Sequence, residues 1–160
     1  MPAELLRTRL VLDECKEHLG DSGAEKTMIE VYLARGVVMT LCSEIEAAVT
    51  ELVFKRVDSN SDAEIVAFSR SVARIVRNAK PGQIGDLLSR FGDGCKERYD
   101  NHLLATIGEA GRGRIGNLVK SRDEFAHVMP PDVTIRDAEE AYSDAVALVT
   151  AVEVALGVTL

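Results

Sequence analysis

Aromatic residues are scarce in this sequence, which has no Trp, four Phe and three Tyr among its 160 residues. Hydrophobic residues still make up 46% of the chain and are mainly Ala, Val and Leu, a composition that favours closely packed helices. No apolar run reaches the roughly 18 residues of a membrane span, and the N-terminus lacks the apolar core of a signal peptide. We therefore expect a cytoplasmic protein with no membrane partner.

Cysteine is also rare, with only Cys15, Cys42 and Cys95 present. The three are odd in number and form no Cys-x-x-Cys pair, which excludes a disulfide framework and a zinc ribbon. The three histidines are scattered along the chain and show no metal-ligand spacing. The sequence therefore predicts neither a metal site nor a cofactor.

The formal net charge of −7 argues against a protein that coats nucleic acid without specificity. Residues 68–80 and 111–122 nevertheless carry four cations each and no acid. Two interpretations stay open for these stretches: solvated helix faces, or a local site for an anion.

Helical periodicity runs through almost the whole chain, and no stretch alternates strictly between apolar and polar residues. The pattern predicts helices at about residues 3–19, 24–57, 62–79, 84–90, 96–107 and 114–128, and a last long helix after Thr134. Between them we expect a break at Pro81-Gly82 and a Gly-rich connector at 108–116. The connector holds a Gly-x-Gly-x-x-Gly pattern, but it follows a helix and not a strand, so we do not assign it to a nucleotide. The sequence predicts one all-α domain over residues 1–160, a helical bundle of about six to seven helices.

The second predicted helix carries a seam of apolar residues at a seven-residue spacing. Such a seam suits shallow-angle packing, either within a bundle or in a dimer. Its members are Val31, Val38, Ile45 and Leu52.

Two helices begin at recognisable caps. Residues 61–64, Ser-Asp-Ala-Glu, form a capping-box pattern before the third helix. Thr134 and Asp137 have the spacing that caps the last helix. In the third helix we expect Ile65 and Phe68 on the stripe that faces the core.

The sixth predicted helix has an arginine on its apolar face. The stripe through Ile115, Leu118 and Val119 passes over position 122, which is Arg122. A guanidinium in a core-facing position is costly unless an acid or an anionic ligand meets it. We expect either a structural ion pair with an acid such as Glu46 of the second helix, or contact with a bound anion.

His127 lies at the C-terminal end of the same predicted helix. Asp123 stands one turn earlier, where its carboxylate can hold the imidazole and raise its pKa. The partial negative charge at the helix C-terminus also favours the protonated, positively charged imidazole. A simple helix cap remains the alternative role for this histidine.

The segment Arg122-Asp-Glu-Phe-Ala-His127 resembles the Arg-x4–6-His motif of HEPN domains, usually Arg-Asn-x-x-Ala-His. The predicted helix order is also similar, with a long second helix, the motif closing the penultimate long helix, a proline-containing turn and one final helix. Within that superfamily the chain looks most like small bacterial proteins of the RiboL-PSP or MAE type. Asp123 stands where the family usually has Asn.

The resemblance implies a homodimer that acts as a metal-independent endoribonuclease of a toxin–antitoxin or defence system, with a cognate antitoxin as a partner. Arg122, His127 and Asp123 would belong to a composite catalytic site that leaves a 2′,3′-cyclic phosphate and a 5′-hydroxyl. The candidates for RNA contact are Arg70, Arg74, Arg77, Arg112, Arg114 and Lys120.

A second hypothesis keeps the fold without the activity. Arg122 and His127 would then serve packing, and the domain would be an interaction module for a partner protein or a nucleotide. Asp123 favours this alternative, because it adds negative charge beside a site that has to hold phosphate. Arg122 in the apolar stripe, with His127 at its end, favours the enzyme.

Overall fold

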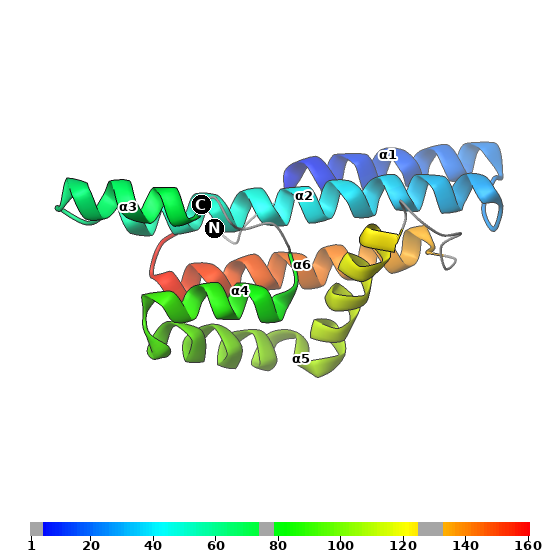
Figure 1. Ribbon diagram of the computed structural model, residues 1–160. Coiled ribbons are helices and arrows are strands. Elements are labelled where there is room, and N and C mark those ends of the chain that lie inside the picture. Colours follow the sequence, from blue (N-terminus) through cyan, green and yellow to red (C-terminus); the bar gives the residue numbers. More distant parts are fainter. Residues whose placement is uncertain (1–4, 74–78, 125–132) are drawn as a thin grey trace.

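The computed structural model describes residues 5–73, 79–124 and 133–160, which form helices joined by turns (Figure 1). No strand occurs within these ranges, so the predicted all-α helical bundle is confirmed. The described elements are α1 (Leu6–Ser22), α2 (Met28–Asp58), α3 (Ala63–Ala73), α4 (Pro81–Leu88), the 3-10 turn η1 (Ser89–Phe91), α5 (Asp93–Glu124) and α6 (Ile135–Leu156).

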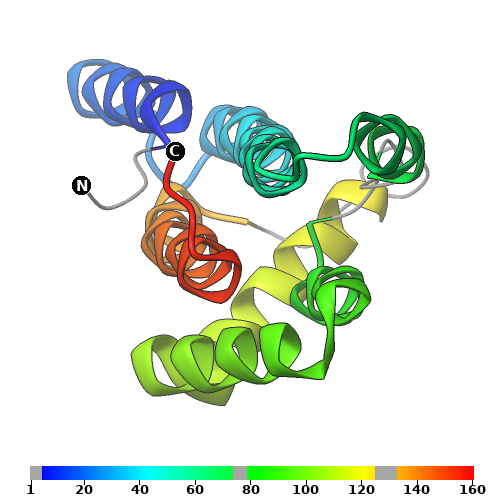
Figure 2. The ribbon, with the colours of Figure 1, turned by 90° about the vertical axis from the view of Figure 1, so that its left-hand side faces the viewer.

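Helix α6 lies at the centre of the bundle and packs against α1, α2, α4 and α5. In the end-on view, α1 and α2 lie on one side of α6 and α5 lies on the other (Figure 2). Alanines supply much of its buried surface, and small side chains let neighbouring helix axes approach closely. Its apolar stripe, which recurs at helical spacing in the sequence, is buried: Ala138, Ala141, Ala145, Leu148, Val152 and Leu156.

The predicted apolar seam of α2 is used inside the bundle. Val38, Ile45 and Leu52 are fully buried, and Val31 is partly buried. Helix α2 packs against α1, α6, α5 and α3. A dimer would therefore have to use a different surface.

Two carboxylates of α2 cap the first turns of neighbouring helices. Glu44 accepts hydrogen bonds from the N–H groups of Arg7 at 3.0 Å and Thr8 at 2.8 Å, at the start of α1. Glu30 accepts one from the N–H of Ile135 at 3.2 Å, at the start of α6. Helix N-termini carry unpaired N–H groups and a partial positive charge, so these acids fix where α1 and α6 begin along α2.

One predicted cap is confirmed and one is displaced by a residue. Thr134 and Asp137 form a complete capping box before α6. For α3, Asp62 Oδ1 accepts from the N–H groups two and three residues ahead, at 2.9 and 3.2 Å. The N-cap is therefore Asp62 and not Ser61. Aspartate is as good an N-cap as serine, and α3 begins at Ala63, directly after it.

Two predicted breaks differ in the structure. Residues 79–80 are not helical, so the first break lies just before Pro81-Gly82 and not at it. Pro81 is the first residue of α4, a position where the missing N–H costs no helical hydrogen bond. The Gly-rich stretch 108–116 is helical apart from Gly108, where φ is 63° and ψ is −175°. Only glycine adopts this conformation readily. Figure 1 shows that α5 bends sharply and that its second half rises toward α2.

Helix α3 extends beyond the end of α6 and packs mainly against α2 (Figure 1). Ile65 and Phe68 are 49% and 71% exposed, so their predicted place in the core is wrong. Periodicity identifies an apolar face but does not say what covers it. Among the described residues, this face of α3 borders an open groove.

Candidate functional site

Arg122 lies in the last described turn of α5, where this helix reaches the middle of α2. Its Nη1 donates to Oε1 of Glu46 at 2.7 Å, which is the ion pair expected from the sequence. Ile115, Leu118 and Val119 precede it on the same face and are buried. These buried residues pack this face of α5 against the bundle. The guanidinium of Arg122 lies at the edge of the face, where it contacts Glu46.

The Arg122–Glu46 pair is only partly removed from water. The arginine side chain is 22% exposed and the glutamate side chain 24%. Charges at this depth are screened less than at the surface. The carboxylate orients the guanidinium and offsets part of its positive charge, while solvent still reaches both groups.

Several predicted site residues cannot be placed beside this pair. His127, Arg74 and Arg77 lie outside the described residues, and Asp123 is described only through its backbone, within α5. Their roles stay predictions.

Arg114 binds α6 through a two-point ion pair. Its Nε lies 2.7 Å from Oδ2 of Asp144, and its Nη2 lies 3.0 Å from Oδ1. The carboxylate is 6% exposed and the guanidinium side chain 46%. The hydrogen bonds to Asp144 raise the pKa of Arg114 above its ordinary value. This guanidinium holds α5 against α6 and is not presented freely to a ligand.

Arg112 spans the bend of α5. Its Nη2 lies 3.4 Å from Oδ1 of Asp100 in the first half of the helix, and its Nη1 lies 3.6 Å from Oε1 of Glu109. Lys96 reaches the same Asp100 at 3.4 Å. Because the Arg112–Asp100 contact joins the two halves of α5 on either side of Gly108, it supports the angle between them.

Arg70 anchors α3 to Asp58, the last residue of α2. Its Nε donates to Oδ1 of Asp58 at 2.9 Å, its Nη2 donates to Oδ2, and its guanidinium lies 5.4 Å from the ring centre of Phe54. The hydrogen bond from Arg70 lowers the pKa of Asp58 below its ordinary value of 3.8. The pKa of Arg70 is raised for the same reason.

The predicted RNA contacts thus lie at separate places. Arg70, Arg112 and Arg114 each join two parts of the fold, and Lys120 is exposed on α5. Asp58 and Glu46 are just over three helical turns apart on α2, roughly 18 Å. Between them runs a shallow groove of about 560 Å³ whose lining includes Glu46, Glu51 and Asp58. Each of these acids is paired with a cation: Glu46 with Arg122, Glu51 with Lys55 and Asp58 with Arg70.

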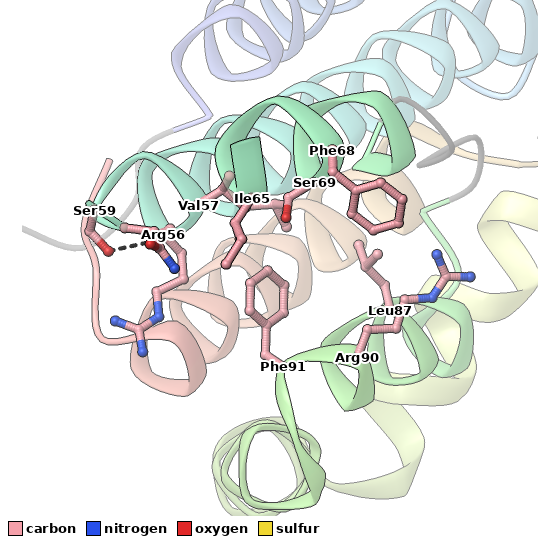
Figure 3. A pocket seen from close by; sticks show the side chains of 11 residues that line it. Arg56, Val57, Ser59, Ile65, Phe68, Ser69, Leu87, Arg90 and Phe91 are labelled. Atoms are coloured by element: carbon pink, nitrogen blue, oxygen red, sulfur yellow. Dashed lines mark hydrogen bonds between the residues drawn. The ribbon is translucent and has the colours of Figure 1, made fainter. Parts of the chain in front are cut away.

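A second groove, also of about 560 Å³, lies between the end of α2, α3 and the α4–η1 segment (Figure 3). No local pattern in the sequence indicates this groove, because its walls come from separate parts of the chain and the apolar stripe of α3 predicts Ile65 and Phe68 in the core. The sequence feature that comes nearest to indicating the groove is the strong apolar stripe of α3, which has only 11 residues. The apolar lining residues are Val53, Val57, Ile65, Phe68, Leu87 and Phe91.

No protein-family model matches the chain, and comparisons with curated proteins and with solved structures found no match either. The fold places the protein among all-α helical bundles. No helix in the described ranges has both the length and the apolarity to cross a membrane. Within the same ranges, no three metal-binding side chains lie close enough to hold an ion.

Proposed function

We propose that the chain is a metal-independent endoribonuclease of the HEPN type, in which Arg122 and His127 from two protomers form one composite site. The supporting observation is that Arg122 stays 22% exposed although Glu46 holds it at 2.7 Å, so a phosphate can still reach the oriented guanidinium. A guanidinium oriented in a partly dry cleft can stabilise the charge that grows on a phosphate. The sequence places His127 five residues further on.

In the proposed reaction, His127 takes the proton from a ribose 2′-hydroxyl. The 2′-oxygen then bonds to the adjacent phosphorus, and the bond from phosphorus to the 5′-oxygen breaks. The histidine of the second protomer gives the leaving oxygen its proton, and Arg122 stabilises the charge on the phosphate. Glu46 is a positioning residue, since it contacts the guanidinium and not the substrate.

The cellular role that follows is that of a toxin or defence component, restrained by a cognate antitoxin. Growth after induced expression tests this role. Wild-type protein should slow growth, and His127→Ala should not. Equal growth of both strains at equal protein levels contradicts a toxic ribonuclease.

The direct experiment measures RNA cleavage by the purified full chain. We expect His127→Ala to lose roughly 10²–10⁴ in rate, the usual contribution of a general acid or base. His102→Ala is the matched control, because His102 is a half-buried histidine in the first half of α5. Its rate should stay close to that of the wild type. Cleavage that survives in His127→Ala would assign the activity to another group or to a contaminant.

A composite site also requires two copies of the chain. Light scattering at micromolar concentration should give twice the mass of one chain. A monomer at the concentration where RNA is cleaved would contradict the shared site.

A non-catalytic interaction module is the second candidate. The observation that favours it is the pairing of Arg70, Arg112 and Arg114 with acids, which leaves less positive charge for RNA. The open apolar groove beside α3 points the same way, because exposed apolar surface of this kind marks interaction sites. A chain that neither cleaves RNA nor slows growth would fit this candidate.

A further inference from the structure

The groove beside α3 has two apolar walls that face each other (Figure 3). Ile65 and Phe68 project from α3, while Leu87 and Phe91 project toward them from α4 and η1. Val57, from the last turns of α2, lines the inner side. Phe68 is 71% exposed, so the groove is open along α3.

Arginines stand at both ends of this groove. Figure 3 shows Arg56 at one end and Arg90 at the other, with the apolar side chains between them. The described residues of the lining include Ser59, Asn60 and Ser69 but no acid, although the chain as a whole is acidic. Neither Arg56 nor Arg90 forms an ion pair with another described residue, whereas Arg70, Arg114 and Arg122 are all paired with acids.

We propose that this groove binds an acidic amphipathic helix of a partner protein. The partner's apolar residues, spaced three and four apart, would lie between the walls formed by Ile65 and Phe68 and by Leu87 and Phe91. Its carboxylates would meet Arg56 and Arg90, which sets orientation and disfavours basic partners. The proposal deepens the second candidate function by giving the partner's chemistry, and it does not depend on ribonuclease activity.

Charge favours a helix over RNA as the occupant. A nucleic acid strand leaving the groove along α2 would find Arg70 and Lys55 already paired with Asp58 and Glu51, so these cations are not free to bind its phosphates. A helix needs acids only at the two ends of the groove. Aliphatic side chains also form most of the apolar lining, which suits leucine-like anchors better than stacked bases.

The test is a displayed library of 16-residue helices with apolar positions at helical spacing and random residues beside them. Selection uses the full chain, with counter-selection against Phe68→Asp, a change at an exposed position that the fold should tolerate. Leu10→Asp is the matched control, because Leu10 is 64% exposed on α1, away from the groove. We expect the selected helices to carry Asp or Glu beside the apolar face and to bind Leu10→Asp like the wild type.

Reversing the charges on the protein and on the peptide then tests whether Arg56 and Arg90 bind the peptide's acids. Binding of a selected peptide, measured by fluorescence anisotropy, should weaken roughly tenfold or more in the double variant Arg56→Glu/Arg90→Glu. The same peptide with its acids changed to lysine should bind that variant better than it binds the wild type. The control Arg7→Glu/Arg136→Glu makes the same change in net charge at exposed positions of α1 and α6 and should leave binding unchanged.

Four results would overturn the proposal. The first is selection of basic or non-amphipathic sequences, or of none that separates the wild type from Phe68→Asp. The second is equal binding by the two double variants. The third is competition by single-stranded RNA or by anionic lipid vesicles that Phe68→Asp abolishes, since the groove would then serve a different ligand. The fourth is a change from dimer to monomer in Phe68→Asp, which would make the occupant a second copy of the chain. Because His127→Ala tests the ribonuclease separately, the two proposals can fail independently.

Discussion

Gly111 of α5 leaves the space that the carboxylate of Asp144 occupies, since a Cβ at residue 111 would lie 2.9 Å from Oδ1. Arg114, on the same stretch of α5, binds both oxygens of that carboxylate. Within four residues of α5, Gly111 leaves space for the carboxylate of Asp144 and Arg114 binds it, so this segment fixes α6 against α5. In the sequence, Arg114 belongs to a basic stretch that suggests a phosphate site. In the fold, it joins two packed helices.

Removing Arg114 and removing Asp144 should destabilise the fold to different extents. Arg114→Ala leaves a carboxylate that is 6% exposed without its partner, and we expect this variant to show the larger loss of the free energy of unfolding. Asp144→Ala leaves a half-exposed guanidinium that water can solvate, and we expect a smaller loss of the free energy of unfolding. Urea unfolding measures both, with exposed Arg136→Ala as the control. The opposite order would mean that Asp144 contributes through packing.

The glycines of α5 should respond differently to the same substitution. Gly108→Ala should lower the free energy of unfolding by about 1–3 kcal/mol, because its backbone conformation excludes a side chain. Gly113→Ala should raise it by about 0.5–1 kcal/mol, because a Cβ there meets nothing within 4 Å and alanine favours the helix. Gly111→Ala should destabilise, since the new Cβ would lie 2.6 Å from Cβ of Ile107. Thermal unfolding of the three variants checks the order, which an equal response at all three positions would contradict.

The Arg122–Glu46 pair allows stability and activity to be separated. Arg122→Ala leaves Glu46 partly buried without its cation, and we expect it to lower the free energy of unfolding by about 1–3 kcal/mol. Glu46→Gln keeps an acceptor oxygen in place and should cost less. If Arg122 stabilises the reacting phosphate, Arg122→Ala should also abolish RNA cleavage at temperatures where it is still folded. Full activity of the folded variant would confine Arg122 to a structural role.

The anchor of α3 should weaken in acid. Because Arg70 lowers the pKa of Asp58 below 3.8 in the folded chain, the pair stabilises the fold above the ordinary pKa of a carboxyl group, and this contribution is lost as the pH falls through the lowered value. An NMR titration of the Asp58 carboxyl should give an ordinary pKa in Arg70→Gln and the lowered one in Arg7→Gln. Equal titration in the two variants would contradict the assignment.

The proposed ribonuclease chemistry has a recognisable product. Cleavage through the ribose 2′-hydroxyl should leave a 2′,3′-cyclic phosphate and a 5′-hydroxyl, and it should continue in EDTA. DNA and 2′-O-methyl RNA should resist the enzyme, because neither offers the attacking hydroxyl. Mass spectrometry of the products reads both ends. A 5′-phosphate, or loss of cleavage upon chelation, would exclude this mechanism.

Local patterns in the sequence were sufficient for the helices and several of their ends. The stripe of α6 and the capping box of Thr134 and Asp137 depend on neighbours within a few residues. The Arg122–Glu46 pair could also be anticipated, because a cation on an apolar stripe needs an acid and α2 offered one. His127 and Asp123, which carry the family resemblance, remain predictions.

The sequence by itself determined that this chain forms apolar helical stripes, because side-chain periodicity and caps are local properties. Only the tertiary structure decided what each stripe and charge meets. It covers the seam of α2 and leaves Phe68 exposed, although both patterns predict burial. It bends α5 at Gly108 and keeps Gly111 helical, and it sets Gly111 against the carboxylate of Asp144. Arg114 and Asp144 are 30 residues apart in the chain. Such pairings follow from helix packing, which brings distant residues into contact and which no local pattern encodes.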